Sequence, residues 1–208
     1  MTLKEDVYNK IYNDVVTGVY KQNEIITEMS LISKYKVSKS PVREALIELC
    51  KEQILQSLPR LGYQVVPVSL KEVLDLIDFR IDVETSGLRR AYANIQESDL
   101  KELEVMAQIC NEEAHDPNWD KNRTFHTRLY EISNNRYGYQ ELQSIMRKNE
   151  RFLAQCFHTA WKNASIHTKD SHVEIVEALR RKDLERALKF LESDIRSVKE
   201  EILGKYAK

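Results

Sequence analysis

The sequence predicts a mostly helical protein with two domains of unequal size. Only five Gly and four Pro occur among 208 residues, and after residue 69 apolar residues recur at the 3.6-residue spacing of amphipathic helices. A chain of this length can bury one large core or two smaller ones, and its 42% apolar and 31% charged residues are typical of a globular protein. We place the domain boundary between residues 68 and 69, since Ser69 can cap the helix that follows.

Residues 1–68 predict three helices followed by a β-hairpin. Apolar residues at helical spacing, a Gly-containing turn after the first helix and cap residues such as Thr27 set the helix limits. Two short β-prone runs on either side of Pro59 to Gly62 favour a hairpin. Three helices and a hairpin are the arrangement of a winged helix-turn-helix. The expected elements span residues 4–18, 27–36, 40–52 and 54–68.

Basic residues gather at the start of the expected third helix, within a stretch from Met29 to Arg43 that contains no acid. Ser38 and Ser40 offer hydroxyl groups that can cap this helix, and Pro41 suits its first turn. The free N–H groups of a helix start also favour phosphate, so the segment is suited to the major groove of DNA. The alternative is a solvated helix face. The four cations are Lys34, Lys36, Lys39 and Arg43.

The charge balance argues against binding of nucleic acid by bulk electrostatics. The whole chain has a formal net charge of −1, with nine Lys and Arg against eight Asp and Glu in residues 1–68. DNA affinity should therefore depend on two copies of the local basic stretch, which predicts a homodimer bound to double-stranded operator DNA. The sequence has no run of 18 apolar residues and no apolar signal region, and its three cysteines match no zinc-binding spacing. We expect a cytoplasmic protein without a membrane span.

Two motifs in the first 68 residues belong together. Val37-Ser-Lys-Ser-Pro-Val-Arg-Glu-Ala-Leu46 is followed by Leu49 and then by Pro59-x-x-Gly62-x-x-Val65. This combination resembles the DNA-binding domain of the GntR family of bacterial transcription regulators. Two departures are that Lys39 stands where the family usually has Arg, which weakens bidentate reading of guanine, and that Asn23 replaces a usual turn Gly. The DNA contacts that the resemblance implies fall on Ser38, Lys39, Ser40 and Arg43, with Gly62 at the wing tip.

The chain after residue 69 predicts six further helices. The first is amphipathic, and Arg80 and Glu84 fall on or beside its apolar stripe four residues apart, which predicts an internal salt bridge. The stripe itself consists of Val73, Ile77, Ile81, Leu88 and Ala91. The helices are expected at about residues 70–94, 97–115, 119–134, 137–160, 166–181 and 183–204.

Four short motifs in these helices carry a second resemblance. They are Arg80-x-x-x-Glu84, Phe125-His126-x-x-Leu129, His172-x-x-Ile-x-x-Ala178-Leu and Lys-Asp183-x-x-x-Ala187. Together they resemble the FCD domain, the ligand-sensing domain of one branch of the GntR family. The resemblance implies an antiparallel helical bundle around a cavity that often holds a small carboxylate effector and a metal ion bound by an Asp and three His. By position the metal ligands become Asn122, His126, His172 and Asp194, and Arg80 is available to pair with an effector carboxylate.

The residue pattern favours a shared site for these side chains. Asn122 and His126 lie one helical turn apart, and His172 and Asp194 each interrupt an apolar stripe. A buried carboxylate needs a cation, hydrogen bonds or protonation. Because Asn122 replaces the usual acid while Asp194 replaces a usual His, the formal ligand charge stays at −1, which favours a retained site for Zn, Ni or Mn. Two alternatives stay open: the cavity binds its effector without metal, or these are ordinary core residues.

The sequence contains no nucleophile-elbow motif, no phosphate-binding loop and no paired acids with a supporting pattern. It predicts a transcription regulator, specifically a repressor, whose operator affinity is controlled by a small organic acid. A competing class is a non-haem metal enzyme, since His126, His172 and Asp194 could form a facial triad. A third class is a constitutive DNA-binding protein. Release of DNA by an effector would separate the three.

Overall fold

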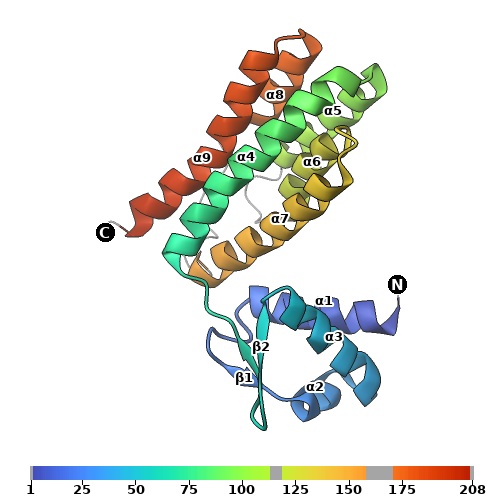
Figure 1. Ribbon diagram of the computed structural model, residues 1–208, viewed down its shortest axis with the longest axis vertical. Helices are drawn as coiled ribbons and strands as arrows, with labels where there is room; N and C mark the ends of the chain where they lie inside the picture. Colours follow the sequence, from blue (N-terminus) through green and yellow to red (C-terminus); the bar gives the residue numbers. More distant parts are fainter. Residues whose placement is uncertain (1, 113–118, 158–170, 207–208) are drawn as a thin grey trace. The chain divides into compact units, whose positions relative to one another are not determined.

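The computed structural model describes residues 2–112, 119–157 and 171–206. It confirms the mostly helical fold with a small antiparallel sheet in the N-terminal part (Figure 1). The described chain divides into two compact units. One contains the chain as far as Leu70 together with residues from Glu150 in the seventh helix, and the other contains the rest of the helical region.

The N-terminal unit contains three helices and a three-stranded antiparallel sheet. Its elements are α1 (Leu3–Val16), β1 (Ile25–Ile26), α2 (Glu28–Tyr35), α3 (Lys39–Lys51), β2 (Leu55–Leu58) and β3 (Gly62–Val65). The strand order is β1-β3-β2, with Ile25 opposite Gln64 and Leu58 opposite Gly62. The hairpin of β2 and β3 is the expected wing. Strand β1 is missing from the sequence prediction because two residues are too few to show an alternating pattern.

Local capping explains where the first two helices begin. The Thr2 hydroxyl accepts from the Glu5 backbone N–H while the Glu5 carboxylate accepts from that of Thr2, and Thr27 and Ser30 form the same reciprocal pair at α2. Lys36, at φ +55°, then ends α2 and turns the chain toward α3. The apolar faces of the helices and sheet meet in one core. Its fully buried members include Val7, Ile11, Leu31, Val42, Leu46, Leu49 and Val65.

The second unit is a bundle of helices, and in Figure 1 α8 and α9 run side by side in opposite directions. The helices are α4 (Leu70–Asn94), α5 (Glu97–Glu112), α6 (Trp119–Glu131), α7 (Arg136–Phe157), α8 (Ser171–Arg180) and α9 (Leu184–Tyr206). The five stripe residues predicted on the first of these helices are all buried. The ends expected at residues 115 and 160 and the start expected at 166 lie outside the described residues. None of the described helices is long and apolar enough to cross a membrane.

Two glycines position α6 between its neighbours. A Cβ atom on Gly87 of α4 would overlap the Tyr130 ring, and one on Gly138 of α7 would overlap the Tyr130 hydroxyl. The ring of Tyr130 on α6 therefore fits against both helices only because neither glycine has a side chain. Tyr130 lies one helical turn after His126, so this contact fixes the part of α6 that carries the polar residues discussed below.

Candidate DNA-binding surface and buried polar site

The predicted DNA-contacting residues of α3 lie at its exposed start. Lys39 and Arg43 have side chains that are 63% and 58% exposed. Ser38 is the N-cap residue of α3, but among the described residues its hydroxyl makes no capping hydrogen bond, and Ser40 lies inside the first turn with its hydroxyl on Glu44. Ser38 therefore has the expected N-cap position without the expected hydrogen bond, and the expectation that Ser40 caps the helix is wrong because Ser40 is already helical.

Gly62 is the first residue of β3, and the turn before it holds Arg60 at φ +67°. Gly62 has φ +133°, and a Cβ there would overlap the Ile26 backbone oxygen of β1. The close approach of two strands thus requires glycine at this position. The exposed Leu61 and Arg60 lie between the two strands, at the turn itself.

An acidic residue that the sequence analysis did not single out lies against the same helix start. Glu28, the first residue of α2, accepts from Arg43 Nε at 3.1 Å and lies 3.7 Å from Lys39 Nζ. The Tyr63 hydroxyl of β3 donates to the same carboxylate at 3.3 Å. Burial acts to raise the pKa of Glu28, but Arg43, together with Lys39 and Tyr63, outweighs burial and lowers it. The available signal was its position immediately before the acid-free stretch.

The second unit contains a cluster of polar side chains in its core. Each member is at most 8% exposed, although such residues are seldom buried without partners. The members come from four helices that are distant in sequence. They are Arg80 and Glu84 on α4, Asn122 and His126 on α6, His172 on α8 and Asp194 on α9.

The structure brings His126, His172 and Asp194 together as three converging donor atoms. The Nε2 atom of His126 lies 3.2 Å from His172 Nε2 and 3.2 Å from Asp194 Oδ2, and the remaining side of the triangle is 3.7 Å. A point equidistant from atoms so arranged lies about 2.0 Å from each, which is the usual length of a bond from nitrogen or oxygen to Zn²⁺. The spacing therefore fits a divalent ion.

Glu84 fixes the direction in which His126 points. The expected Arg80–Glu84 salt bridge is present, and the second oxygen of Glu84 accepts from His126 Nδ1 at 2.6 Å. With Nδ1 donating, Nε2 of His126 is turned toward the other two donors. From the sequence alone, Glu84 is predicted only as the salt-bridge partner of Arg80.

Two further groups adjoin the triangle. The Ser171 hydroxyl donates to Asp194 Oδ1 at 2.5 Å, which directs Oδ2 toward the histidines. The Asn122 amide nitrogen lies 3.3 Å from His172 Nε2. Turning the amide by 180° would present its oxygen instead, which is the weak neutral ligand expected from the sequence.

The neighbours of His126 and Asp194 favour the charged form of each side chain, although both are buried. Burial opposes a charged imidazolium, yet the Glu84 carboxylate with help from Asp194 raises the pKa of His126. Burial also opposes ionised Asp194, but the two histidines and Ser171 outweigh it and lower the pKa of that carboxyl. On α5, burial and the charge of Asp194 raise the pKa of the Cys110 thiol to about 11, so this free thiol is neutral at pH 7.

Arg80 carries the one donor of this cluster that lacks a partner in the described part of the chain. Its Nε donates to Glu84, whereas its buried Nη2 has no hydrogen-bond acceptor there. An unmet guanidinium N–H in a protein core is costly. This donor is therefore suited to an acidic group that enters the site.

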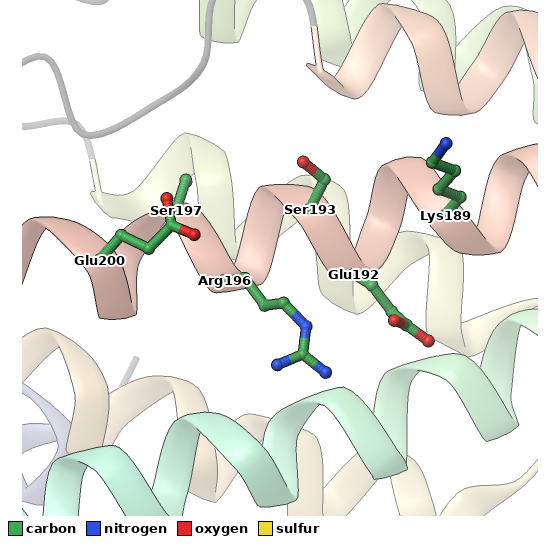
Figure 2. Close-up of a pocket in the computed structure, with 6 residues that line it drawn as sticks. All are labelled: Lys189, Glu192, Ser193, Arg196, Ser197 and Glu200. Atoms are coloured by element: carbon green, nitrogen blue, oxygen red, sulfur yellow. The ribbon is translucent and has the colours of Figure 1, made fainter.

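A separate hollow of about 290 Å³ lies along the outside of α9. Figure 2 shows that its side chains point to different sides of that helix, with Glu192 and Arg196 on one side and Lys189 and Ser193 on the other. The hollow includes none of the clustered residues, and its groups carry both signs of charge without converging. Its lining among the described residues is Lys189, Glu192, Ser193, Arg196, Ser197 and Glu200.

A winged helix-turn-helix with exposed cations at the start of α3, carried on the same chain as a helical bundle, defines a DNA-binding regulator. Residues 3–65 match the model of the bacterial regulatory proteins of the gntR family, and residues 75–197 match the FCD domain. The chain belongs to the GntR family, in its FCD branch. It is a DNA-binding transcription regulator and not an enzyme.

Two relatives agree with this assignment, and a solved structure shares the fold. The HTH-type transcriptional repressor GlaR of Escherichia coli is 27% identical over 199 residues, which cover 88% of this chain and 87% of that protein. The gluconate operon transcriptional repressor of Bacillus licheniformis is 27% identical over 191 residues, or 88% and 78% of the two chains. The structure of E. coli McbR/YncC has the same fold, with a TM-score of 0.79 and 19% identity over 99% of both chains.

Proposed function

We propose that the protein is a homodimeric repressor in the cytoplasm that releases operator DNA when a small carboxylate, assisted by a divalent ion, binds in the C-terminal bundle. The observation that carries this proposal is the convergence of His126, His172 and Asp194 beside the unpartnered Nη2 of Arg80. Two relatives are named as repressors, and one of these names refers to a gluconate operon. Gluconate is itself a small carboxylate.

His126, His172 and Asp194 would hold the ion, with Asn122 at the margin. Two imidazole nitrogens and one carboxylate oxygen suit Zn, Ni or Mn. Without an ion, the two ring nitrogens lie 3.2 Å apart and need at least one proton between them to form a hydrogen bond. A metal cation between the two nitrogens would take the place of that proton. When bound, the ion would supply open coordination positions for a carboxylate.

Arg80 would pair with the carboxylate of the effector. Its guanidinium is planar and permanently charged, and the contact to Glu84 uses only Nε. Its buried Nη2, which has no acceptor among the described residues, can therefore donate to a second acid. The paired Glu84 keeps Arg80 from being an isolated buried charge before the effector arrives.

The DNA would be read by Ser38, Lys39, Ser40 and Arg43 in the major groove, with the wing around Gly62 beside it. A two-fold symmetric dimer would present two such helix starts, so the operator would be a palindrome. Footprinting that showed one asymmetric half-site protected by a monomer would contradict this part of the proposal.

The direct test is to select operators from random DNA and then to screen small organic acids for release. The screen is run on chelated protein and on protein reloaded with Zn, Ni or Mn. Arg80→Lys is the matched variant, because it keeps a charge for Glu84 but lacks the planar fork. We expect release by one class of acid, enhanced by metal and weakened in Arg80→Lys. Operator binding that no acid and no metal alters would instead identify a constitutive DNA-binding protein.

A further inference from the structure

Glu28 connects three parts of the DNA-binding surface. It begins α2, its carboxylate contacts Arg43 and Lys39 on α3, and it accepts from Tyr63 on the wing strand β3. The two cations are more than half exposed, whereas the Glu28 side chain is only 19% exposed. A half-buried carboxylate therefore lies behind two exposed cations.

The contact to Arg43 uses the nitrogen that base recognition does not need. Arg43 donates to Glu28 through Nε, so this contact does not use the two terminal nitrogens. Bidentate recognition of guanine O6 and N7 requires two donors held in one plane. By holding Nε, Glu28 fixes the plane of the guanidinium before DNA arrives, which lowers the entropy lost on binding.

The charge of Glu28 also distinguishes two kinds of acceptor. A DNA phosphate carries a negative charge and is repelled by a carboxylate a few ångströms behind its cationic partner. The major-groove edge of guanine offers neutral acceptors and is repelled much less. The same carboxylate thus weakens non-specific phosphate binding and favours base contacts.

We infer that Glu28 is a specificity-determining residue of the DNA-binding surface, which orients Arg43 for a base edge and disfavours phosphate at Arg43 and Lys39. This inference rests on the proposed placement of Arg43 and Lys39 on DNA. Because Arg43 and Lys39 are exposed, their ion pairs with Glu28 contribute little to stability, and we expect Glu28→Gln to cost little stability.

The test compares the full-length wild type with Glu28→Gln on a selected operator and on an unrelated duplex of the same length, over a series of KCl concentrations. Glu28→Gln should bind the unrelated duplex more tightly than the wild type does, and with a steeper salt dependence. The ratio of its affinity for the operator to its affinity for the unrelated duplex should fall about fivefold to tenfold, which is comparable to the loss of one weak base contact. Glu48→Gln is the matched control, because Glu48 lies on α3 but pairs with Lys4 and Lys51. Its ratio should equal that of the wild type.

Two further variants keep the outcomes separable. Tyr63→Phe removes only the wing hydrogen bond to Glu28 and should lower the ratio less than Glu28→Gln does. Should Glu28→Gln fail to fold, an unchanged ratio in Tyr63→Phe overturns the inference. An unchanged ratio in folded Glu28→Gln overturns it as well, provided that Arg43→Ala weakens operator binding. If Arg43→Ala has no effect either, the proposed DNA surface is itself wrong.

Discussion

His126 donates from Nδ1 to the Glu84 carboxylate across 2.6 Å, and Nε2 of the same ring lies 3.2 Å from Asp194 Oδ2. One imidazole therefore joins a carboxylate of α4 to a carboxylate of α9. The ring cannot rotate without losing both contacts. A carboxylate behind a histidine in this way sets its tautomer and strengthens it as a metal ligand.

Replacing Glu84 by Gln should weaken divalent ion binding about 10-fold to 100-fold, the usual effect of losing such a supporting carboxylate. Calorimetric titration of chelated protein with Zn²⁺ measures this directly. Glu104→Gln is the control, since Glu104 pairs with Arg180 on the exposed face and should bind Zn²⁺ as the wild type does. Equal affinities in Glu84→Gln and wild type would mean that Glu84 does not support ion binding through His126.

Metal binding should stabilise the C-terminal bundle. The donors come from α6, α8 and α9, so an ion at 100 times its Kd adds about 2.7 kcal/mol to the free energy of unfolding by mass action. Elemental analysis of protein purified without chelator, with melting curves at added metal, gives the measurement. The shift should vanish in His172→Ala and Asp194→Ala, and the transition of the winged unit should not move. Identical melting of wild type with and without metal would leave these side chains as core residues.

The stability that the charged His126 gives to chelated protein and the stability that a bound ion gives should depend on pH in opposite directions. In chelated protein the raised pKa of His126 contributes stability that is fully present below about pH 6.5 and is lost as pH rises through the folded pKa. The lowered pKa values of Asp194 and Glu84 contribute stability that is lost as pH falls below about 4. An ion competes with the proton on His126, so the melting shift that metal produces should grow from pH 6 to pH 8.

Thermal unfolding monitored separately in chelated and metal-loaded protein between pH 5 and pH 8 tests this. A metal-induced shift that stays constant over that range would contradict competition with the imidazole proton.

Much of the fold and part of the candidate site follow from local patterns. The 3.6-residue stripe places Ile77 and Leu88 inside, and the one-turn spacing of Asn122 and His126 puts them on one face. Asp194 stands out because it interrupts an apolar stripe, and it is indeed buried. Periodicity therefore gives the inward direction of each side chain.

Periodicity does not tell which inward side chains of different helices touch. The Glu84–His126 contact joins residues 42 apart, and the Arg43–Glu28 contact joins residues 15 apart, so both depend on how helices pack. The alternation that reveals a strand is likewise absent from β1, which exists because it pairs with β3. The partners of the candidate site residues come from tertiary structure.

Arg43 and Lys39 at the start of α3 should have different effects on operator binding when they are replaced. Arg43→Ala should weaken operator binding by about 1–3 kcal/mol, the range of one base-directed contact, while Lys39→Ala should mainly relax sequence preference. Fluorescence anisotropy on the operator and on single-base variants distinguishes the two. A uniform loss across sequences with a shallower salt dependence would show that Arg43 contacts a phosphate. Unchanged affinity in both variants would place the interface elsewhere.

The contact of Tyr130 with two helices predicts that Gly87→Ala destabilises the bundle. The added methyl would overlap the Tyr130 ring, and overpacking of this kind costs about 1–3 kcal/mol. Gly204→Ala is the matched control, because a Cβ at Gly204 of α9 has no described atom within 4 Å. There the same change should raise the free energy of unfolding by up to about 1 kcal/mol through helix propensity. Urea unfolding of both variants measures the difference.

Because Tyr130 lies one turn from His126, Gly87→Ala should also weaken Zn²⁺ binding, whereas Gly204→Ala should leave it intact. Opposite stability changes with equal Zn²⁺ affinities would show that the packing of α6 does not position His126.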